Sequence, residues 1–253
     1  MLALAMEDFA YQDDYDVEER HWWFRSRRSV IWALVDRAGL PPSPRILDAG
    51  CGAGRNIVEF GRLGPAEGVD HSSQAVEFCR RRGLSEVRQA PIEDLPYEDG
   101  RFDLVLATDV VEHLRDEGPA LQELRRVTAP DGRLILTVPA YGWLWSTHDT
   151  AYHHFRRYTK RLLAERARSN GWEPVVGTYF FSSLLPPVAA VRMLQRVRRT
   201  GTNGNGHGRS DLHLSPAALD RLLAMPGRAE AGLIRRGASL PAGVSVGMVC
   251  MRR

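Results

Sequence analysis

The chain has 253 residues, of which 43% are apolar and 26% charged, as in a globular protein with one large α/β domain or two small ones. The 34 basic and 31 acidic residues leave a net charge of +3, which is too small to indicate a nucleic-acid-binding protein. No apolar run reaches the roughly 18 residues of a membrane span, and the N-terminus turns acidic too early for a signal peptide, so we expect a cytoplasmic protein. Cys51, Cys79 and Cys250 lack metal-ligand spacing, which predicts reduced thiols and no metal site.

Short β-like segments alternate with helical segments, the pattern of a wound parallel sheet with helices on both faces. Residues 1–40 precede the first strand and are interpreted as an N-terminal helical flank or lid. The expected strands are 45–49, 67–70, 86–90, 102–109, 133–139, 173–181 and 244–251. The expected helices are 55–63, 72–82, 110–127 and 159–170, with Ser72 and Thr159 as N-caps.

Residues 182–241 separate the last two strands and are interpreted as an insertion into a core formed by residues 41–181 and 242–253. The insertion contains a helix-like stretch near residues 215–236, and residues 201–210 are expected to be mobile. An uncharged apolar run over residues 179–191 is followed by Arg192, Arg196, Arg198 and Arg199. This combination is found in segments that lie on anionic membranes, but a lid or a dimer contact would explain it equally well. The oligomeric state is left open.

The segment ILDAGCGAGRN, residues 46–56, runs from an apolar strand through Asp48, Gly50, Gly52 and Gly54 into a helix. Glycines allow positive φ and a close approach of the backbone to a ligand, and the helix N-terminus presents unpaired N–H groups. Asp70 ends the next strand, where an acid can accept hydrogen bonds from both ribose hydroxyls. The pattern predicts an adenosine-containing ligand; a tight turn and an ordinary helix cap are the alternative.

These residues, together with GVDHS, PIEDLPYEDGRFDLVLATDVVEHL and GRLILTVPA, resemble the class I S-adenosylmethionine-dependent methyltransferases. The resemblance implies a Rossmann-like, seven-stranded sheet, mostly parallel with an antiparallel last strand, and S-adenosylmethionine as cofactor. The spacing G-x-G-x-G differs from the G-x-G-x-x-G of nicotinamide-dependent oxidoreductases, which are one alternative. A non-catalytic cofactor-binding protein is the other.

The resemblance also implies roles for individual residues. Gly50 and Gly52 would lie along the methionine part of the cofactor, and Asp48 would order the turn. Asp70 would bind the ribose, and Asp109 would face the transferred methyl group. Pro91 stands where the family often has a polar side chain, which leaves the adenine to Ile92 and to Glu93 or Asp94.

Methyl transfer requires an aligned acceptor and, for most oxygen or nitrogen acceptors, a base. The loop of residues 141–158 follows the fifth strand and should border the acceptor pocket. Its candidate catalytic residues are His148, His153, His154 and Tyr158, and its candidate substrate-binding residues are Trp145, Asp149, Arg156 and Arg157. Alternatively, His148 and Asp149 cap a turn and the two arginines lie on a solvated face.

Further residues are open to two interpretations. Trp22 and Trp23 could close over the cofactor while Arg25 or Arg28 meets a carboxylate, or this helix could pack on the sheet. His113 is expected to pack beneath the cofactor. The predicted substrate is a small-molecule or lipid-linked acceptor, anionic if the arginines bind it; the acceptor atom stays open between oxygen, nitrogen and carbon.

Overall fold

The computed structural model describes residues 12, 15, 17–199 and 217–253. The segment 201–210, expected to be mobile, lies outside these residues. All three cysteines are buried and free.

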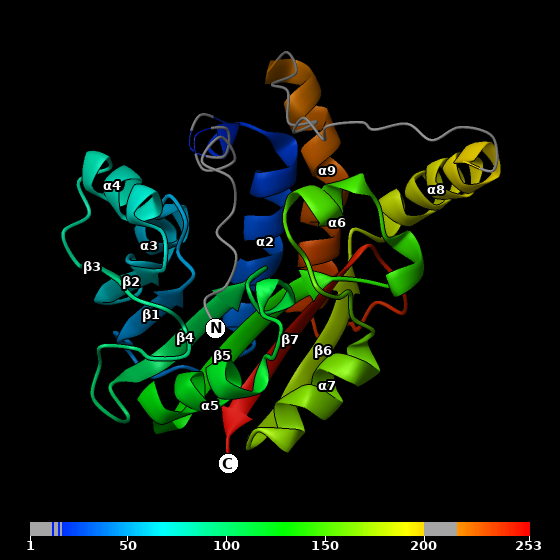
Figure 1. Cartoon of the computed structure of the whole chain (residues 1–253). Coiled ribbons are helices and arrows are strands. Elements are labelled where there is room, and N and C mark those ends of the chain that lie inside the picture. The colour runs from blue at the N-terminus through cyan, green and yellow to red at the C-terminus, as the bar shows by residue number, and fades with distance from the viewer. Residues whose placement is uncertain (1–11, 13–14, 16, 200–216) are drawn as a thin grey trace.

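A single seven-stranded sheet forms the centre of the molecule, with the strand order β3-β2-β1-β4-β5-β7-β6 (Figure 1). Neighbouring strands from β3 to β5 are parallel, whereas β7 is antiparallel to both β5 and β6. The predicted seven-stranded sheet with an antiparallel last strand is therefore confirmed. The strands are β1 (Ile46–Ala49), β2 (Ala66–Asp70), β3 (Val87–Gln89), β4 (Phe102–Thr108), β5 (Thr128–Pro139), β6 (Trp172–Phe180) and β7 (Ser245–Arg252).

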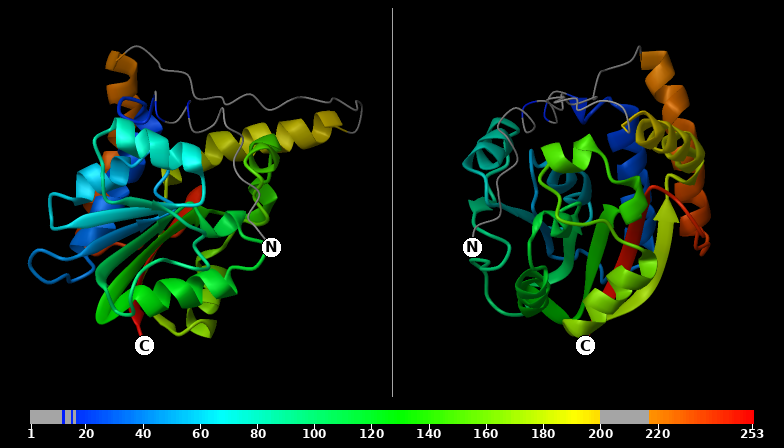
Figure 2. Two further views of the ribbon diagram at one scale, coloured as in Figure 1. Left: turned by 60° about the vertical axis from the view of Figure 1, so that its left-hand side comes forward. Right: turned by 45° about the vertical axis from the view of Figure 1, so that its right-hand side comes forward.

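Helices cover both faces of the sheet, as Figure 2 shows. One core joins α5 and α7 to the sheet, and its largest member is the fully buried Trp172, whose indole N–H donates to the carbonyl of Leu121. The other core joins α2 and α9 to the opposite face. The helices are α2 (Trp22–Asp36), α3 (Arg55–Phe60), α4 (Ser73–Arg81), α5 (Gly118–Val127), α6 (Thr147–Ala151), α7 (Lys160–Ser169), α8 (Leu185–Arg199) and α9 (Ala217–Arg235), with 3₁₀ turns η1 (Val111–His113), η2 (Gly142–Leu144) and η3 (Ser182–Leu184).

The predicted helix 110–127 is wrong as one element, because the chain forms the short turn η1 and then α5. Pro119 lies in the first turn of α5, the position where a missing N–H costs nothing, so it starts a helix here and does not continue one. The carboxylate of Asp116 accepts the amide of Gly118 at 3.0 Å and helps this second start. The break leaves Glu112 and His113 on a turn directly beyond β4.

The expected N-caps are confirmed. The hydroxyl of Ser72 accepts the amide of Ala75 at the start of α4, and the hydroxyl of Thr159 accepts the amide of Leu162 at the start of α7. Each satisfies an amide that a helix start leaves unpaired.

Helix α2, from the N-terminal flank, and helix α9, from the 182–241 segment, pack against each other on one face of the sheet. Val30, Ile31 and Leu34 of α2 are completely buried. The helices approach so closely that a Cβ atom on Gly227 would lie 2.4 Å from the Cβ of Ser26. Both segments therefore contribute to the hydrophobic core.

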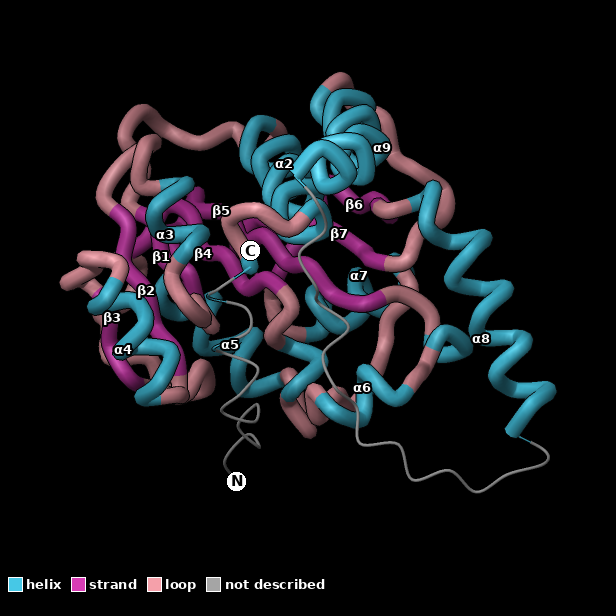
Figure 3. Tube along the Cα trace, turned by 90° about the horizontal axis from the view of Figure 1, so that it is seen from above, coloured by secondary structure: helices cyan, strands magenta, loops and turns pink. Residues whose placement is uncertain are grey.

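Helix α8 extends away from the sheet, as Figures 1 and 3 show. Its two prolines, Pro186 and Pro187, lie in the first turn, where they are compatible with a helix. Val191, Met193 and Leu194 are 50%, 66% and 51% exposed. Within the described ranges, no helix combines the length and apolar character that a bilayer span requires.

Candidate active site

The glycine-rich turn follows β1, and its three glycines all have positive φ: Gly50 at 77°, Gly52 at 53° and Gly54 at 82°. A Cβ atom on Gly50 would lie 2.5 Å from Val110, whereas the same position on Gly52 has open space. The Asp70 carboxylate accepts the amides of Gly52 and Ser72, each at 2.9 Å. The acid at the end of β2 thus fixes the turn after β1.

A cavity of about 640 Å³ lies where β1, β2, β4 and β5 end, the edge at which ligands bind in open α/β sheets. One end is formed by residues expected to bind the cofactor. The other end carries histidines and arginines from the 141–158 loop and α8. The lining includes Gly50, Gly52, Asp70, Ile92, Glu93, Asp109, Glu112, His113, His148, His154, Arg157, Leu184, Val188 and Arg192, with Trp22, Trp23 and Arg27 from α2.

Asp109 lines the cavity and directly follows the last residue of β4. Its carboxylate pairs with Arg27 of α2 at 2.8 Å and accepts the hydroxyl of Thr137 at 3.0 Å. Arg27 also donates to the carbonyl of Thr108 at 2.8 Å, and its guanidinium lies 5.4 Å from the centre of the Trp23 ring. Helix α2 therefore contacts the cavity directly.

The arginine that meets this carboxylate is not the one expected. Arg28 lines the cavity but donates to the backbone carbonyl of Glu18, and Arg25 is not among the lining residues. Arg27 lies four residues after Trp23 and so shares its helix face, which the packing of α2 turns toward the cavity.

Asp149 organises the histidine-rich loop. Its fully buried carboxylate lies 2.9 Å from Nδ1 of His154, pairs with Arg157 at 2.7 Å and accepts the amide of Ser146 at 2.8 Å. Although burial favours the neutral acid, hydrogen bonds from His154 and Arg157 hold the pKa of Asp149 well below its ordinary value. The carboxylate pairs with His154 and Arg157 and does not itself line the cavity.

Several other expected site residues lie outside the cavity lining. His153 has a positive φ of 54° and is not brought to the cavity beside its neighbour His154. Tyr158 is fully buried in the core under the sheet edge. Trp145 is 37% exposed, and Arg156 pairs with Glu117. Two of the expected cofactor residues also face elsewhere: Gly54 begins α3 against Leu84 and Cys79, and Asp94 is exposed.

Asp48 lies beneath the turn with a fully buried carboxylate, not in the cavity lining. Burial raises its pKa to about 7, although a hydrogen bond with Asn56 acts in the opposite direction. This placement fits the expected role in ordering the turn rather than direct contact with a ligand.

Glu112, like Arg27, lines the cavity but was not singled out from the sequence. It is fully buried, and burial followed by the charge of Asp109 raises its pKa. The neighbouring His113 was expected only to pack; its ring lies 4.7 Å from that of His154, and burial lowers its pKa to about 3. The signal in the sequence was the motif VVEHL directly after the fourth strand.

The residues at the turn fit the predicted cofactor. Gly52 lines the cavity with open space where a side chain would stand, and Asp70 places a carboxylate at its wall. Val69 and Ile92 supply apolar surface beside it. Strand order and antiparallel β7 also differ from the order 3-2-1-4-5-6 of the classic dinucleotide-binding fold. Fold and site together define an α/β domain whose cavity fits an adenosine-containing cofactor.

Comparisons with known proteins agree with this class. The methyltransferase domain family matches residues 47–136. Malonyl-[acyl-carrier protein] O-methyltransferase of Pseudescherichia vulneris is 33% identical over 208 residues, which cover 76% of this chain and 79% of that protein. A solved S-adenosylmethionine-dependent methyltransferase of Thermotoga maritima has a TM-score of 0.58 at 18% identity, over 98% of this chain and 100% of that one. The chain belongs to the class I S-adenosylmethionine-dependent methyltransferases.

The prediction of a methyltransferase that uses S-adenosylmethionine is thus confirmed over the nicotinamide-dependent alternative. The length of the match varies among relatives. A protein encoded in a Streptomyces fradiae transposon is 36% identical over 155 residues, which are 58% of this chain and 44% of that protein. The chain therefore spans less than half of this relative.

Proposed function

We propose that this methyltransferase acts on a small-molecule or lipid-linked acceptor that combines an apolar body with an anionic group. The observation that carries the proposal is the continuity of the cavity, which reaches from Asp70 to the histidines of the 141–158 loop and to Arg192 of α8. Cofactor and acceptor would share one chamber, with Asp109 and Arg27 between their binding ends.

The composition of the acceptor end supports this class of substrate. Trp22, Trp23, Leu184 and Val188 supply an apolar wall. Arg192 supplies positive charge, and arginine binds carboxylates and phosphates in a bidentate manner, whereas the guanidinium of Arg157 is already paired with Asp149. The relative from Pseudescherichia vulneris is named as an O-methyltransferase of a malonyl group, which agrees with an anionic acceptor.

Bound S-adenosylmethionine supplies an electrophilic methyl group. The chain would hold it through the glycine turn and Asp70, and would orient the acceptor against the apolar wall. For an acceptor that must lose a proton, the candidate bases at the acceptor end of the cavity are the imidazole rings of His148 and His154. A well-placed base of this kind contributes about 10²–10⁴-fold to a rate.

Formation of S-adenosylhomocysteine from S-adenosylmethionine, measured by mass spectrometry with a panel of carboxylic acids, phosphates and neutral analogues, tests the proposal. We expect turnover with amphiphilic anions and a higher KM after Arg192→Gln than after the control Arg161→Gln, which lies on an exposed helix face. Turnover of neutral analogues only, or no effect of Arg192→Gln on KM, would contradict the anionic acceptor.

A lipid-linked acceptor would bring the enzyme to a membrane surface, and we propose that α8 makes this peripheral contact. Support comes from the exposed Val191, Met193 and Leu194 on a helix that stands away from the core. Met193→Glu should reduce co-sedimentation with vesicles of anionic phospholipid severalfold. The control is Val175→Glu, at a residue that is 48% exposed on β6. Equal sedimentation of both variants would rule out this contact.

A further inference from the structure

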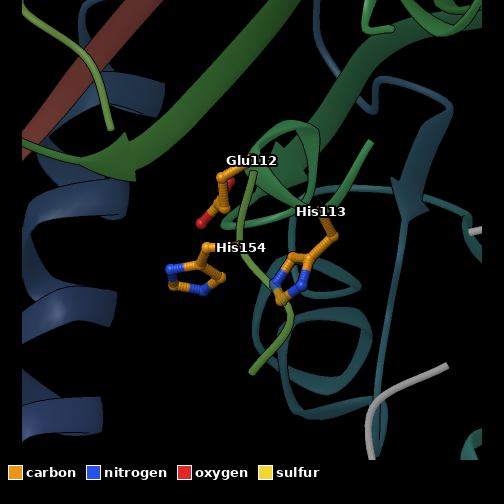
Figure 4. Close-up of side chains that lie close together, drawn as sticks. All are labelled: Glu112, His113 and His154. Atoms are coloured by element: carbon orange, nitrogen blue, oxygen red, sulfur yellow. The ribbon is translucent and has the colours of Figure 1, made fainter. Parts of the chain in front are cut away.

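We propose that Glu112, His113 and His154 bind one divalent transition-metal ion at the acceptor end of the cavity. The candidate ligand atoms of these three side chains lie within 4.8 Å of one another. Figure 4 shows the carboxylate of Glu112 and the two imidazole rings side by side. Glu112 and His113 come from η1 directly after β4, whereas His154 comes from the loop that follows α6. No metal was expected from the sequence, because that expectation rested on the spacing of the three cysteines alone.

The carboxylate of Glu112 is the first observation that points to a cation. The residue is completely buried, and neither carboxylate oxygen has a hydrogen-bond partner among the described residues. The other two carboxylates nearby are each paired with an arginine, Asp109 with Arg27 and Asp149 with Arg157. A buried carboxylate without a partner is costly, and a bound cation would offset that cost.

The hydrogen bonding of His154 is the second observation. Its Nδ1 lies 2.9 Å from the Asp149 carboxylate, so that Nδ1–H donates to Asp149 and Nε2 is left to face the cavity. Metal-binding histidines almost always donate their second ring N–H to a carboxylate or carbonyl in this way. The His113 ring stands edge-on at 4.7 Å, which places a second imidazole beside the first.

The ligand set indicates which ions would bind. Two imidazoles and one carboxylate suit Zn²⁺, and also Fe²⁺ and Mn²⁺ in sites with open positions. Metal–ligand bonds of about 2.0–2.2 Å would draw the three side chains closer together than they lie here. Three protein ligands leave a position for an exogenous oxygen, and all three side chains line the cavity.

This inference rests on the proposed function in one respect only, the identity of the fourth ligand. An acceptor with a hydroxyl or carboxylate oxygen would bind the ion and be held beside the cofactor. A bound divalent ion lowers the pKa of an attached hydroxyl, which favours its deprotonation. His148, which is not part of the cluster, would stay available to take the proton.

The test uses the full chain, freed of metal with a chelator and titrated with Zn²⁺ alone and with Co²⁺ alone by calorimetry. We expect one equivalent to bind. Glu112→Gln and His113→Gln should each weaken binding by at least about 100-fold, and Asp149→Asn, which removes an outer partner, by about 10–100-fold. The control His153→Gln changes a histidine adjacent to His154 but outside the cluster, and should bind like the unchanged chain.

A second measurement does not depend on whether the variants fold. Bound Co²⁺ is paramagnetic, so the unchanged chain should show shifted ¹H resonances from two coordinating imidazoles. Absence of binding, absence of shifted imidazole signals, or equal weakening by His153→Gln and Glu112→Gln would each overturn the metal site. These titrations contain no acceptor and so test the metal site alone. In the separate assay with the acceptor panel, metal binding by a chain that transfers no methyl group would count against the proposed function, and methyl transfer by a chain that binds no metal would count against the metal site.

Discussion

At the scale of single residues, Asp70 performs a structural task that can be seen without a ligand. Its carboxylate holds the amide of Gly52 in the glycine turn and the amide of Ser72 at the start of α4. An ionised carboxylate can accept several hydrogen bonds, so these bonds are compatible with the expected contact to a ribose. The same side chain would therefore affect both stability and cofactor affinity.

We expect Asp70→Asn to weaken binding of S-adenosylmethionine by about 1–3 kcal/mol, the range for hydrogen bonds to a charged group. Calorimetric titration measures this change. Asp99→Asn is the control, since the side chain of Asp99 is 76% exposed. An unchanged dissociation constant for Asp70→Asn would remove this residue from the cofactor site.

Asp48 predicts a pH dependence of stability. Burial raises its pKa from 3.8 to about 7, so the unfolded chain loses this proton at lower pH than the folded chain does. Its contribution to the free energy of unfolding is therefore present below about pH 4, is lost as the pH rises to about 7, and stays constant above.

Asp48→Asn removes this titration. Urea unfolding at pH 5 and pH 8 should show that the variant gains stability relative to the unchanged chain at the higher pH. Asp131→Asn, at an exposed residue of β5, should show no such gain. A difference between Asp48→Asn and the unchanged chain that is the same at both pH values would contradict the assignment.

At the scale of elements, α2 links the N-terminal part of the chain to the reacting centre. The pair of Arg27 and Asp109 joins this helix to the end of β4, and Trp23 lies beside the same arginine. The orientation of Asp109, which has a φ of 58°, thus depends on a helix more than 70 residues earlier in the chain.

Arg27→Gln should lower kcat/KM by about 10-fold or more, because it leaves the Asp109 carboxylate without its cation. Arg25→Gln on the same helix is the matched control, as Arg25 does not line the cavity. Steady-state kinetics with the best acceptor from the panel would measure the difference, and equal rates for both variants would show that the pair is dispensable.

The elements also show where sequence reasoning succeeds and fails. Asp70 and the glycines were predicted because their roles follow from local order, at the end of a strand and in the turn before a helix. Arg27 was missed in favour of Arg25 and Arg28, because the rotation of α2 is decided by its packing on the sheet. The sequence does not show which of His153 and His154 lines the cavity, because the positive φ of His153 decides where the two side chains point. Glu112 was hidden by the expectation of one unbroken helix.

At the scale of the whole molecule, the N-terminal flank and the 182–241 segment are parts of one core. Val30, Ile31 and Leu34 of α2 cover the sheet residues Leu104 and Ile135, and α9 packs beside them. The alternation of strands and helices predicted the sheet but not this partnership, because α2 and α9 are about 200 residues apart in the chain.

Removal of residues 1–40 should therefore abolish cooperative thermal unfolding, because it exposes the apolar face beneath α2. Differential scanning calorimetry of the shortened chain, compared with the full chain, measures this. A sharp transition within a few degrees of the original would show instead that α2 is a dispensable cover.

The link between Asp70 and Gly52 also bears on how fast and how specifically a nucleoside associates. Because Asp70 already holds the amide of Gly52, the turn does not have to become ordered when a nucleoside binds. The loss of conformational entropy on binding is therefore small. The cofactor end of the cavity should therefore select its nucleoside as a preformed, rigid site. Adjustment to acceptors of different shape should occur at the other end, which is built from the 141–158 loop.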